Sequence, residues 1–368
     1  MNRNLPVFCF TLLVLLALTV LMSNAQEAGL EQPQRVETSI GIYDVQSRND
    51  IHKFSASEIR ELIRLENGRN QGADTVPHPV LIYCFEEKIF RYTNGKYQDA
   101  EIKYRLHTPK NIRFGRKYPL VVHLHGIGEA GSDNISSLVH LHSVLPLMIG
   151  PGRQDFFMLV VQNPEETPGW FFRPSTQDGT LDVLVAAMEH VIRENPIDRR
   201  RITATGVSSG GWGVWELILR HPDIFAGAVP TACGAPHPTQ RLAALNRTRI
   251  WSITNSGDGN SDSIRTAMQV VNSSGGFMGH TEPNVEGHNA WRPAMEDYNC
   301  FQWMLAQKRG SWFSPPPGVI VHNNPRPLLL AFVFYIVPIA IIVYLLWGRL
   351  CEWIPIVFQS IKGWCSRF

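Results

Sequence analysis

The sequence predicts an α/β fold, with a mostly parallel sheet flanked by helices. Short apolar runs at 118–124 and 156–161 are typical of strands buried on both faces of a sheet. Apolar residues recur at helical spacing over 181–192, and a glycine-rich turn joins a third β-like run, 202–205, to another helical segment. Strands that alternate with helices in this way indicate a parallel sheet covered by helices.

The remaining elements follow in chain order. Ser55 and Glu58 form a capping-box pattern before a short helix within a polar extension of unknown role, 26–79. The main domain is expected over 80–309. Its helix over 181–192 stops at 195–196, and the cluster 199–201 is expected to be a solvated turn before the strand. Strands are predicted at 250–253 and 277–281, and helices at 264–271 and 295–305.

Both ends of the chain carry apolar runs of the kind that insert into membranes. Residues 1–25 combine Arg3, an apolar run and small residues before position 26, which predicts a cleaved signal peptide; the alternative is an uncleaved anchor. Residues 328–347 contain no charge over the length of a membrane helix, after a proline-rich linker at 310–327. The basic, amphipathic tail 348–368 is expected in the cytoplasm, which places the main domain outside it.

The net charge and the cysteine and histidine content narrow the partners, disulfides and cofactors that can be expected. A net charge of +2 gives no global field that favours nucleic acid, so none is expected as a partner. Cys84, Cys233 and Cys300 fall in the main domain, and either one disulfide with a free thiol or three buried thiols fits their number. The pairs His123/His125 and His140/His142 lack a matching carboxylate cluster, so neither a metal nor a cofactor is expected.

The turn GVSSG at 206–210 carries the chemical interpretation. A strand, then G-x-S-x-G, then a helix is the context of a nucleophile elbow, with Ser208 as the central serine. The glycines would let the strand and helix approach, and the Ser209 amide at the helix start could donate to an oxyanion. The alternative is a glycine-rich loop with ordinary hydroxyls.

A base and an acid follow Ser208 in the order that this type of site requires. His288 lies in a loop between the strand 277–281 and the final helix. Asp258 lies just after the strand 250–253, and Asp262 is a competing acid at the start of the next helix. We therefore predict Ser208, Asp258 and His288 as the catalytic residues, with Asp258 preferred to Asp262 because of its loop position.

Two further predictions concern the oxyanion and the substrate. The loop His125-Gly126-Ile127 follows an early strand, so the Ile127 backbone N–H is assigned as the second oxyanion donor beside that of Ser209. Trp170 and Phe171, in a loop after another strand, are candidates for substrate binding, although aromatic clusters often only pack.

The segments YPLVVHLHGIGEAGSDN, DRRRITATGVSSGGWGVWELILRHPDIFAGAVPTACG and VEGHNAW resemble the α/β-hydrolase superfamily. The similarity covers about 85–308 and is to secreted esterases and predicted peptidases related to phospholipase/carboxylesterases, feruloyl esterases and polyhydroxyalkanoate depolymerases. It implies that Ser208, Asp258 and His288 match the family's nucleophile, acid and base, and that 125–127 matches its oxyanion loop. Thr254-Asn255 and Asn260-Ser261 depart from the family's usual residues around the acid.

The combined expectation is a membrane-anchored, extracytoplasmic serine hydrolase that cleaves small or polymeric carboxylic esters. A serine peptidase with the same residues, or a non-catalytic binding module of the same fold, is the alternative.

Overall fold

The computed structural model describes residues 55, 57–60, 77, 79–94, 97–163, 180–284, 287–290, 300–311 and 314. The predicted signal peptide, span and tail, most of the predicted extension and linker, and Trp170 and Phe171 lie outside these residues. Within them, no helix combines the length and apolar character needed to cross a membrane. The predicted capping box does form, because the Ser55 N–H donates to Glu58 Oε2 at 2.7 Å and the Glu58 N–H donates to Ser55 Oγ at 3.3 Å.

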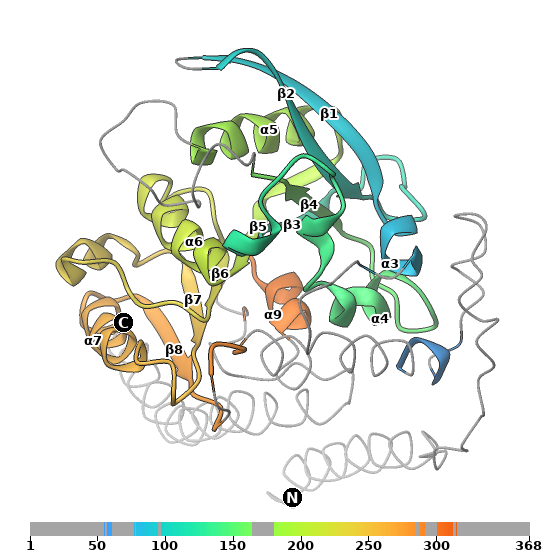
Figure 1. Ribbon diagram of the computed structural model, residues 1–368. Helices are drawn as coiled ribbons and strands as arrows, with labels where there is room; N and C mark the ends of the chain where they lie inside the picture. Colours follow the sequence, from blue (N-terminus) through green and yellow to red (C-terminus); the bar gives the residue numbers. More distant parts are fainter. Residues whose placement is uncertain are drawn as a thin grey trace, which may run out of the picture. The chain divides into compact units, whose positions relative to one another are not determined.

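The sheet has eight strands in the order β1-β2-β4-β3-β5-β6-β7-β8 (Figure 1). The pairs β1/β2 and β2/β4 are antiparallel, and every other pair is parallel. The predicted α/β class is confirmed. The strands are β1 (Glu86–Asn94), β2 (Tyr97–His107), β3 (Tyr118–Leu124), β4 (Phe157–Val161), β5 (Ile197–Val207), β6 (Gly227–Thr231), β7 (Arg249–Ile253) and β8 (Phe277–Thr281).

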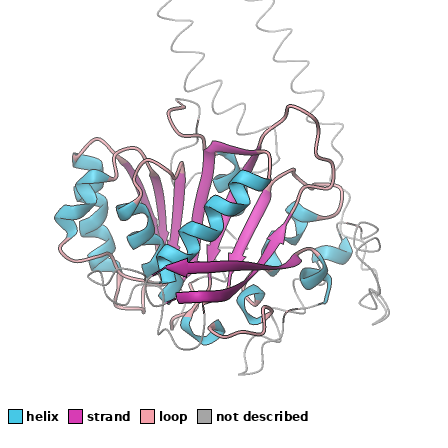
Figure 2. Cartoon of the chain, turned by 90° about the horizontal axis from the view of Figure 1, so that it is seen from above, coloured by secondary structure: helices cyan, strands magenta, loops and turns pink. Residues whose placement is uncertain are grey.

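Helices lie on either side of the strands (Figure 2). The described α-helices are α3 (Pro79–Tyr83), α4 (Leu145–Met148), α5 (Thr180–Glu194), α6 (Ser209–Arg220), α7 (Ser261–Ser273) and α9 (Cys300–Ala306). The described 3-10 turns are η3 (Ile127–Glu129), η4 (Ser136–Leu138), η5 (His142–Val144) and η6 (Thr239–Ala244). The helices predicted around 181–192 and 264–271 are therefore confirmed. The last predicted helix is described only from Cys300.

One hairpin was not predicted. The segments 86–94 and 97–107 form the long antiparallel pair β1/β2, for which no element was expected from the sequence. Residues of β1 alternate between half-buried and exposed side chains, as expected of a strand at the sheet edge. The sequence signal was present, because Asn94-Gly95 is a strong hairpin turn between two alternating segments.

The expectation of a solvated turn at 199–201 is wrong, because these arginines lie inside β5. Arg199 Nη2 pairs with Glu189 Oε2 of α5 at 2.7 Å. The half-buried Arg201 donates from Nη2 to the Leu305 carbonyl of α9 at 2.7 Å. Groups on neighbouring helices therefore accept hydrogen bonds from Arg199 and Arg201, so β5 can continue through a run of three arginines.

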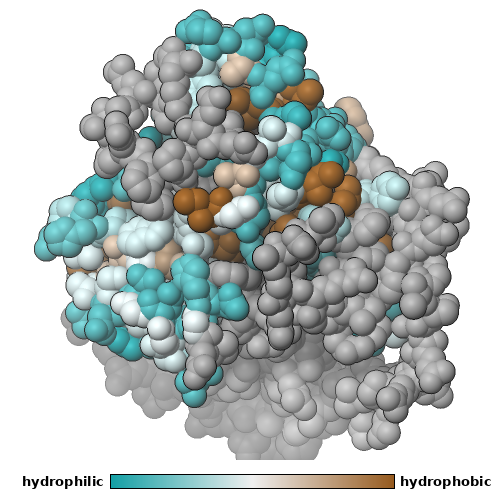
Figure 3. Space-filling model, viewed as in Figure 1, coloured by the Kyte–Doolittle hydropathy of each residue, from teal (hydrophilic) through white to brown (hydrophobic). Residues whose placement is uncertain are grey.

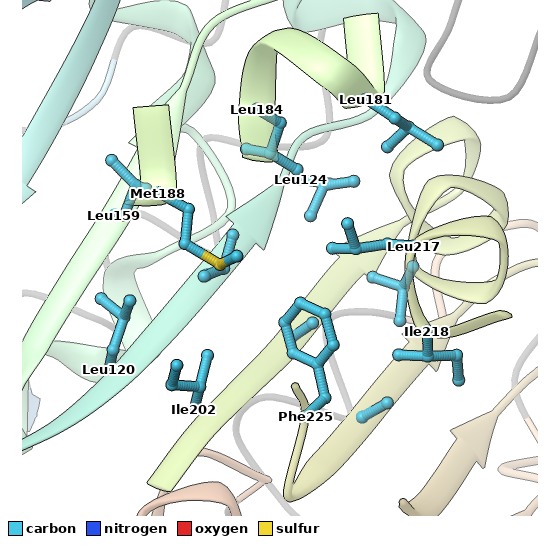
Figure 4. Packing of buried hydrophobic residues seen from close by; sticks show 14 of the residues in the cluster. Leu120, Leu124, Leu159, Leu181, Leu184, Met188, Ile202, Leu217, Ile218 and Phe225 are labelled. Atoms are coloured by element: carbon cyan, nitrogen blue, oxygen red, sulfur yellow. The ribbon is translucent and has the colours of Figure 1, made fainter. Parts of the chain in front are cut away.

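Two apolar layers hold the sheet between helices. On one face, Leu120, Leu124 and Ile202 of the strands pack against Leu184 and Leu217 of α5 and α6 (Figure 4). On the other face, Trp303 of α9 packs edge to face on Trp251 of β7, with ring centroids 5.6 Å apart. Fully burying side chains of this size stabilises the fold by roughly 1.5–3 kcal/mol each. The sheet is thus a rigid base for the loops at its edges.

Cys84, Cys233 and Cys300 are buried thiols that form no disulfide, which settles the alternative left open by their number. Burial raises the pKa of both the Cys233 and the Cys300 thiol far above the ordinary value, so these side chains behave as small apolar groups.

Candidate active site

Ser208 lies at a sharp turn between β5 and α6. Its backbone has φ 52° and ψ −116°, a conformation that L-residues rarely adopt. The Ser208 N–H donates to the Thr231 carbonyl of β6 at 2.9 Å, and the Ser208 carbonyl accepts from the Trp212 N–H at 3.1 Å. Bonds on both sides of the residue therefore hold the strained turn, which is typical of functional sites.

The glycines around Ser208 are required by close backbone approach. A Cβ at Gly210 would overlap the Leu124 carbonyl oxygen and lie 2.6 Å from that of His125. A Cβ at Gly206 would overlap Gly210 and lie 2.9 Å from the Leu124 oxygen. The start of α6 is thus pressed against the end of β3, so the turn tolerates no side chain at these two positions.

Three side chains from distant loops converge at this edge. His288 Nε2 lies 2.8 Å from Ser208 Oγ, and His288 Nδ1 lies 2.9 and 3.0 Å from the two oxygens of Asp258. An ionised carboxylate only accepts, so Nδ1 carries the proton and Nε2 is left as the acceptor for the serine hydroxyl. This is the arrangement in which an imidazole can remove a proton from a serine.

The competing acid, Asp262, does not join this group. Its side chain is 96% exposed and pairs with Arg265 on the first turns of α7. The Asp258 side chain is 11% exposed and faces the imidazole. Only Asp258 is placed to orient His288.

The loops that carry Asp258 and His288 are braced against each other. Asn255 Nδ2 donates to the Gly287 carbonyl at 2.8 Å, and the Ser256 N–H donates to the Pro283 carbonyl at 3.2 Å. The Asp258 N–H donates to the Asn255 carbonyl at 3.1 Å. Asn255 is one of the residues that depart from the family pattern, and its contacts show that it joins the acid loop to the base loop. Its departure from the pattern was the one sequence signal that pointed to it.

The loop after β3 presents the Ile127 backbone N–H at the first position of η3. His125 fixes this loop. The Asn163 N–H donates to His125 Nε2 at 2.9 Å, so Nδ1 must carry the proton that it donates to the Gly126 carbonyl at 2.6 Å. In a trans peptide the N–H points away from the C=O, so fixing the Gly126 carbonyl also fixes the direction of the Ile127 N–H.

The Glu129 side chain packs against the same loop. Its Oε1 lies 3.2 Å from His140 Nε2, and its Oε2 is buried so close to Gly126 that an added Cβ would lie 2.7 Å from it. Burial alone would raise the pKa of Glu129, but the hydrogen bond and charge of His140 outweigh burial and hold that pKa below its usual value. Sequence reasoning missed this pair, because the two residues are neighbours only in the folded chain.

His123, one of the histidines considered above as a metal ligand, lies in β3 and away from solvent. His123 is fully buried, and its pKa lies well below the ordinary value because burial disfavours the imidazolium. The described residues include no group of three or more metal-ligand side chains. Of the predicted site residues, Ser208, Asp258 and His288 are brought into hydrogen-bonding contact. Ser209 and Ile127 lie at the starts of α6 and η3, and Trp170 and Phe171 are outside the described residues.

Known proteins of similar sequence and structure are hydrolases. A model of the prolyl oligopeptidase family matches residues 172–235. A crystal structure of a thermostable esterase is similar with a TM-score of 0.56 and 27% identity, over 62% of this chain and 64% of that one. The chain thus spans less than two thirds of that esterase's length. No curated protein matches.

Weaker similarity extends to an acylaminoacyl peptidase from Pyrococcus horikoshii, with a TM-score of 0.47 and 16% identity over 64% of this chain and 44% of that one. A ferulic acid esterase has a TM-score of 0.48 and 15% identity, over 60% of this chain and 97% of that one. The sheet order and the esterase match show the α/β-hydrolase fold, and together with the family-model match they support a serine esterase or peptidase of that superfamily.

Proposed function

We propose that this protein is a carboxylic ester hydrolase in which Ser208 is the nucleophile, His288 the general base and Asp258 the residue that orients His288. The observation that carries the proposal is the unbroken pair of hydrogen bonds from Asp258 through His288 to Ser208. Each of these distances is within hydrogen-bonding range without any movement of the site.

In the acylation step, Ser208 Oγ attacks the ester carbonyl carbon while His288 Nε2 takes the hydroxyl proton. The carbonyl oxygen becomes an oxyanion, and the backbone N–H groups of Ser209 and Ile127 are the proposed donors to it. Ser209 begins α6, so the partial positive charge of the helix start adds to this stabilisation. Collapse of the intermediate expels the alcohol, which takes the proton from His288 and leaves an acyl group on Ser208.

Deacylation repeats the cycle with water. His288 Nε2 removes a proton from water, the resulting hydroxide attacks the acyl carbon, and collapse returns the proton to Ser208 Oγ with release of the acid. The carboxylate of Asp258 stabilises the imidazolium in both halves of the cycle. No cofactor is needed for either step.

We further propose that the domain is membrane-anchored and extracytoplasmic. The support is in the sequence: a signal-like segment at 1–25, an uncharged run at 328–347 and a basic tail after it. The proposed substrate is a small or polymeric ester outside the cytoplasm.

Peptide hydrolysis by the same residues is the second candidate. The observation in its favour is the match of residues 172–235 to the prolyl oligopeptidase family, a segment that contains Ser208. An acyl-enzyme forms from an amide as it does from an ester, and His288 would protonate the leaving amine as it protonates the leaving alcohol. Release of amines from short peptides, measured beside alcohol release from esters of the same acyl group, distinguishes the two.

The test is covalent labelling of the full chain with a fluorophosphonate probe. We expect labelling of the wild type, none of Ser208→Ala, and at least about a 100-fold slower reaction of His288→Ala, because general-base catalysis contributes about that much or more. Ser209→Ala is the matched control, since it removes the adjacent hydroxyl and keeps the backbone N–H. A wild type that does not label, or a Ser208→Ala variant that does, would show that the domain is a binding module or uses another nucleophile.

A further inference from the structure

The sheet edge formed by the amino ends of the parallel strands, opposite Ser208, is strongly cationic. A pocket of about 730 Å³ opens at the amino ends of β5 to β8, whereas Ser208 lies at the carboxyl end of β5. Among the lining residues are the cations Arg200, Arg247, Arg249, Lys308 and Arg309, and Asp223 is the single carboxylate. The chain as a whole carries a net charge of only +2, so positive charge is concentrated at this edge.

Two of these cations, Arg200 and Arg249, have uncharged partners. Arg200 Nη2 donates to the Arg309 carbonyl at 2.9 Å, and the Arg249 guanidinium lies over the Phe277 ring, 4.5 Å from its centroid. In the lining, Arg247 pairs with Asp223 at 2.9 Å, and that pair is exposed. One carboxylate against five cations leaves the described lining with a net positive charge that can attract a further anion.

The loop before β3 adds apolar side chains to the same edge. Tyr118, which follows this loop, donates its N–H to the Pro196 carbonyl directly before β5, so the loop and the start of β5 are neighbours. Phe114 is fully exposed and Ile112 is 51% exposed. Their neighbours in the loop are the exposed cations Lys110, Arg113, Arg116 and Lys117.

The chain leaves the described domain at this edge. Ser311 lines the pocket, and Ser314 Oγ holds the backbone of Lys308 through bonds of 3.0 and 3.1 Å. The predicted span begins at Leu328. The intervening chain reaches roughly 50 Å at full extension, which limits how far this edge can lie from a bilayer.

We propose that this basic edge, made of the pocket cations and the 110–117 loop, is a surface that binds phospholipid headgroups. The cations would contact lipid phosphates, and Phe114 and Ile112 would enter the interfacial layer. An exposed aromatic ring among cations fits a lipid interface, where an apolar body and a charged group are both stabilised, and has no use in a site for free phosphate alone. The proposal rests on the membrane anchorage proposed above and not on the catalytic role of Ser208.

The test uses the full chain reconstituted into nanodiscs of phosphatidylcholine and phosphatidylserine in a four to one ratio, or of phosphatidylcholine alone. A photo-crosslinking benzoylphenylalanine replaces Phe114 in one sample. In the control sample it replaces Ile89 of β1, which is 51% exposed and outside the basic edge. We expect lipid adducts by mass spectrometry at position 114 and not at position 89, with more in discs that contain phosphatidylserine.

A variant that lacks two pocket cations separates lipid binding by the pocket from lipid binding by the basic tail 348–368. Each cation near an anionic surface contributes about a five-fold gain in binding, so Arg247→Gln with Lys308→Gln should lower the phosphatidylserine adduct by up to about 25-fold. Arg91→Gln with Arg265→Gln removes two exposed cations elsewhere and should leave the adduct unchanged. The rate of ester hydrolysis in detergent should be the same in the two crosslinker variants and the two charge variants. This control separates loss of lipid binding from loss of fold or of catalysis.

Several outcomes would overturn the proposal. Equal adducts at positions 114 and 89, or a charge variant that behaves like its control, would show that the edge is an ordinary solvated surface. Loss of the adduct in inorganic phosphate, but not in chloride of equal ionic strength, would assign the pocket to a free anion. A glycan on Asn246 of the native chain, which lies in the pocket within an Asn-Arg-Thr acceptor sequence, would hold the edge away from lipid. Extraction of the wild type from membranes by alkaline carbonate would instead refute the anchorage on which the proposal rests.

Discussion

The side chain of Asp258 determines which nitrogen of His288 carries the proton. Both carboxylate oxygens face Nδ1, so the imidazole presents an unprotonated Nε2 to Ser208. An amide in place of the carboxylate can donate to Nδ1, which would move the proton to Nε2 and remove the base.

We therefore predict that Asp258→Asn lowers kcat for ester hydrolysis by about 10³- to 10⁴-fold, as loss of the orienting acid does in other serine hydrolases. Asp262→Asn is the control, because that carboxylate is exposed and pairs only at the surface with Arg265; its kcat should stay within about two-fold of the wild type. Steady-state kinetics on one ester suffices. A larger loss in Asp262→Asn than in Asp258→Asn would reassign the acid.

Asp133 holds the segment that follows the loop 125–127 through several hydrogen bonds. Its carboxylate accepts from the Ile135 N–H, from the N–H and hydroxyl of Ser136, and from Gln162 Nε2. Burial would raise the pKa of Asp133, but these donors outweigh burial and lower that pKa to about 2. A folded-state pKa below the unfolded value of about 3.9 means that the carboxylate stabilises the fold above pH 4 and loses this effect as the pH falls toward 2.

Asp133→Asn should consequently lower the urea midpoint at pH 7, and the difference from the wild type should shrink as the pH falls from about 4 to about 2. Asp99→Asn is a suitable comparison, since Asp99 is exposed on the β1/β2 hairpin and forms a surface pair with Arg91. A difference that stays constant over this pH range would mean that the Asp133 side chain acts through packing and not through its charge.

Among the elements, the β5 turn into α6 depends most on side-chain size. The start of α6 touches the carbonyl groups at the end of β3, and this contact also sets the distance between Ser208 and the oxyanion loop. The strained Ser208 backbone persists because β6 and α6 hold it on both sides.

Gly210→Ala should destabilise the domain by about 3 kcal/mol or more, because the new methyl group meets fixed backbone oxygens and no flexible side chain can move aside. Gly152→Ala is the matched control, since the nearest atom to its added Cβ is 3.8 Å away; its effect should be under about 1 kcal/mol. Urea unfolding measures both. Equal stability of the two variants would contradict the close contact between α6 and β3.

At the scale of the whole molecule, the two ends of the parallel strands have different chemistry. The carboxyl ends carry Ser208, Asp258 and His288, and the amino ends carry the basic edge. Elsewhere hydrophilic and hydrophobic residues are mixed over the visible surface of the described domain (Figure 3). Loops at opposite ends of a sheet can change without affecting each other, so anchorage and catalysis are expected to separate by mutation.

A chain that ends after Ser314 tests this separation. We predict that it keeps fluorophosphonate labelling and the ester kcat of the full chain but is released into the medium, because it lacks the proposed span at 328–347. A matched chain in which only the tail 348–368 is deleted should stay in the membrane. Retention of the chain that ends after Ser314 through an alkaline carbonate wash, which removes protein held only by the basic edge, would point to an uncleaved N-terminal anchor.

Local sequence patterns predicted most of the sheet and helix positions. The run at 118–124 is a strand at those bounds, and all of its residues are buried, as expected of a strand inside a parallel sheet. The sequence pattern was insufficient where residues that are distant in sequence but close in space determine the secondary structure. The arginines at 199–201 continue β5 because α5 and α9 accept their hydrogen bonds, and no local rule includes those partners.

The site shows the same division. The sequence by itself determined the turn at Ser208, because glycine spacing around a strand-to-helix turn is a local requirement, and chain order pointed to His288. Loop position favoured Asp258 over Asp262, but only the tertiary structure shows which of the two carboxylates reaches an imidazole 30 residues away. It also decided the support by Glu129, His140 and Asn255, because hydrogen bonds between loops depend on how the sheet brings distant strand ends together.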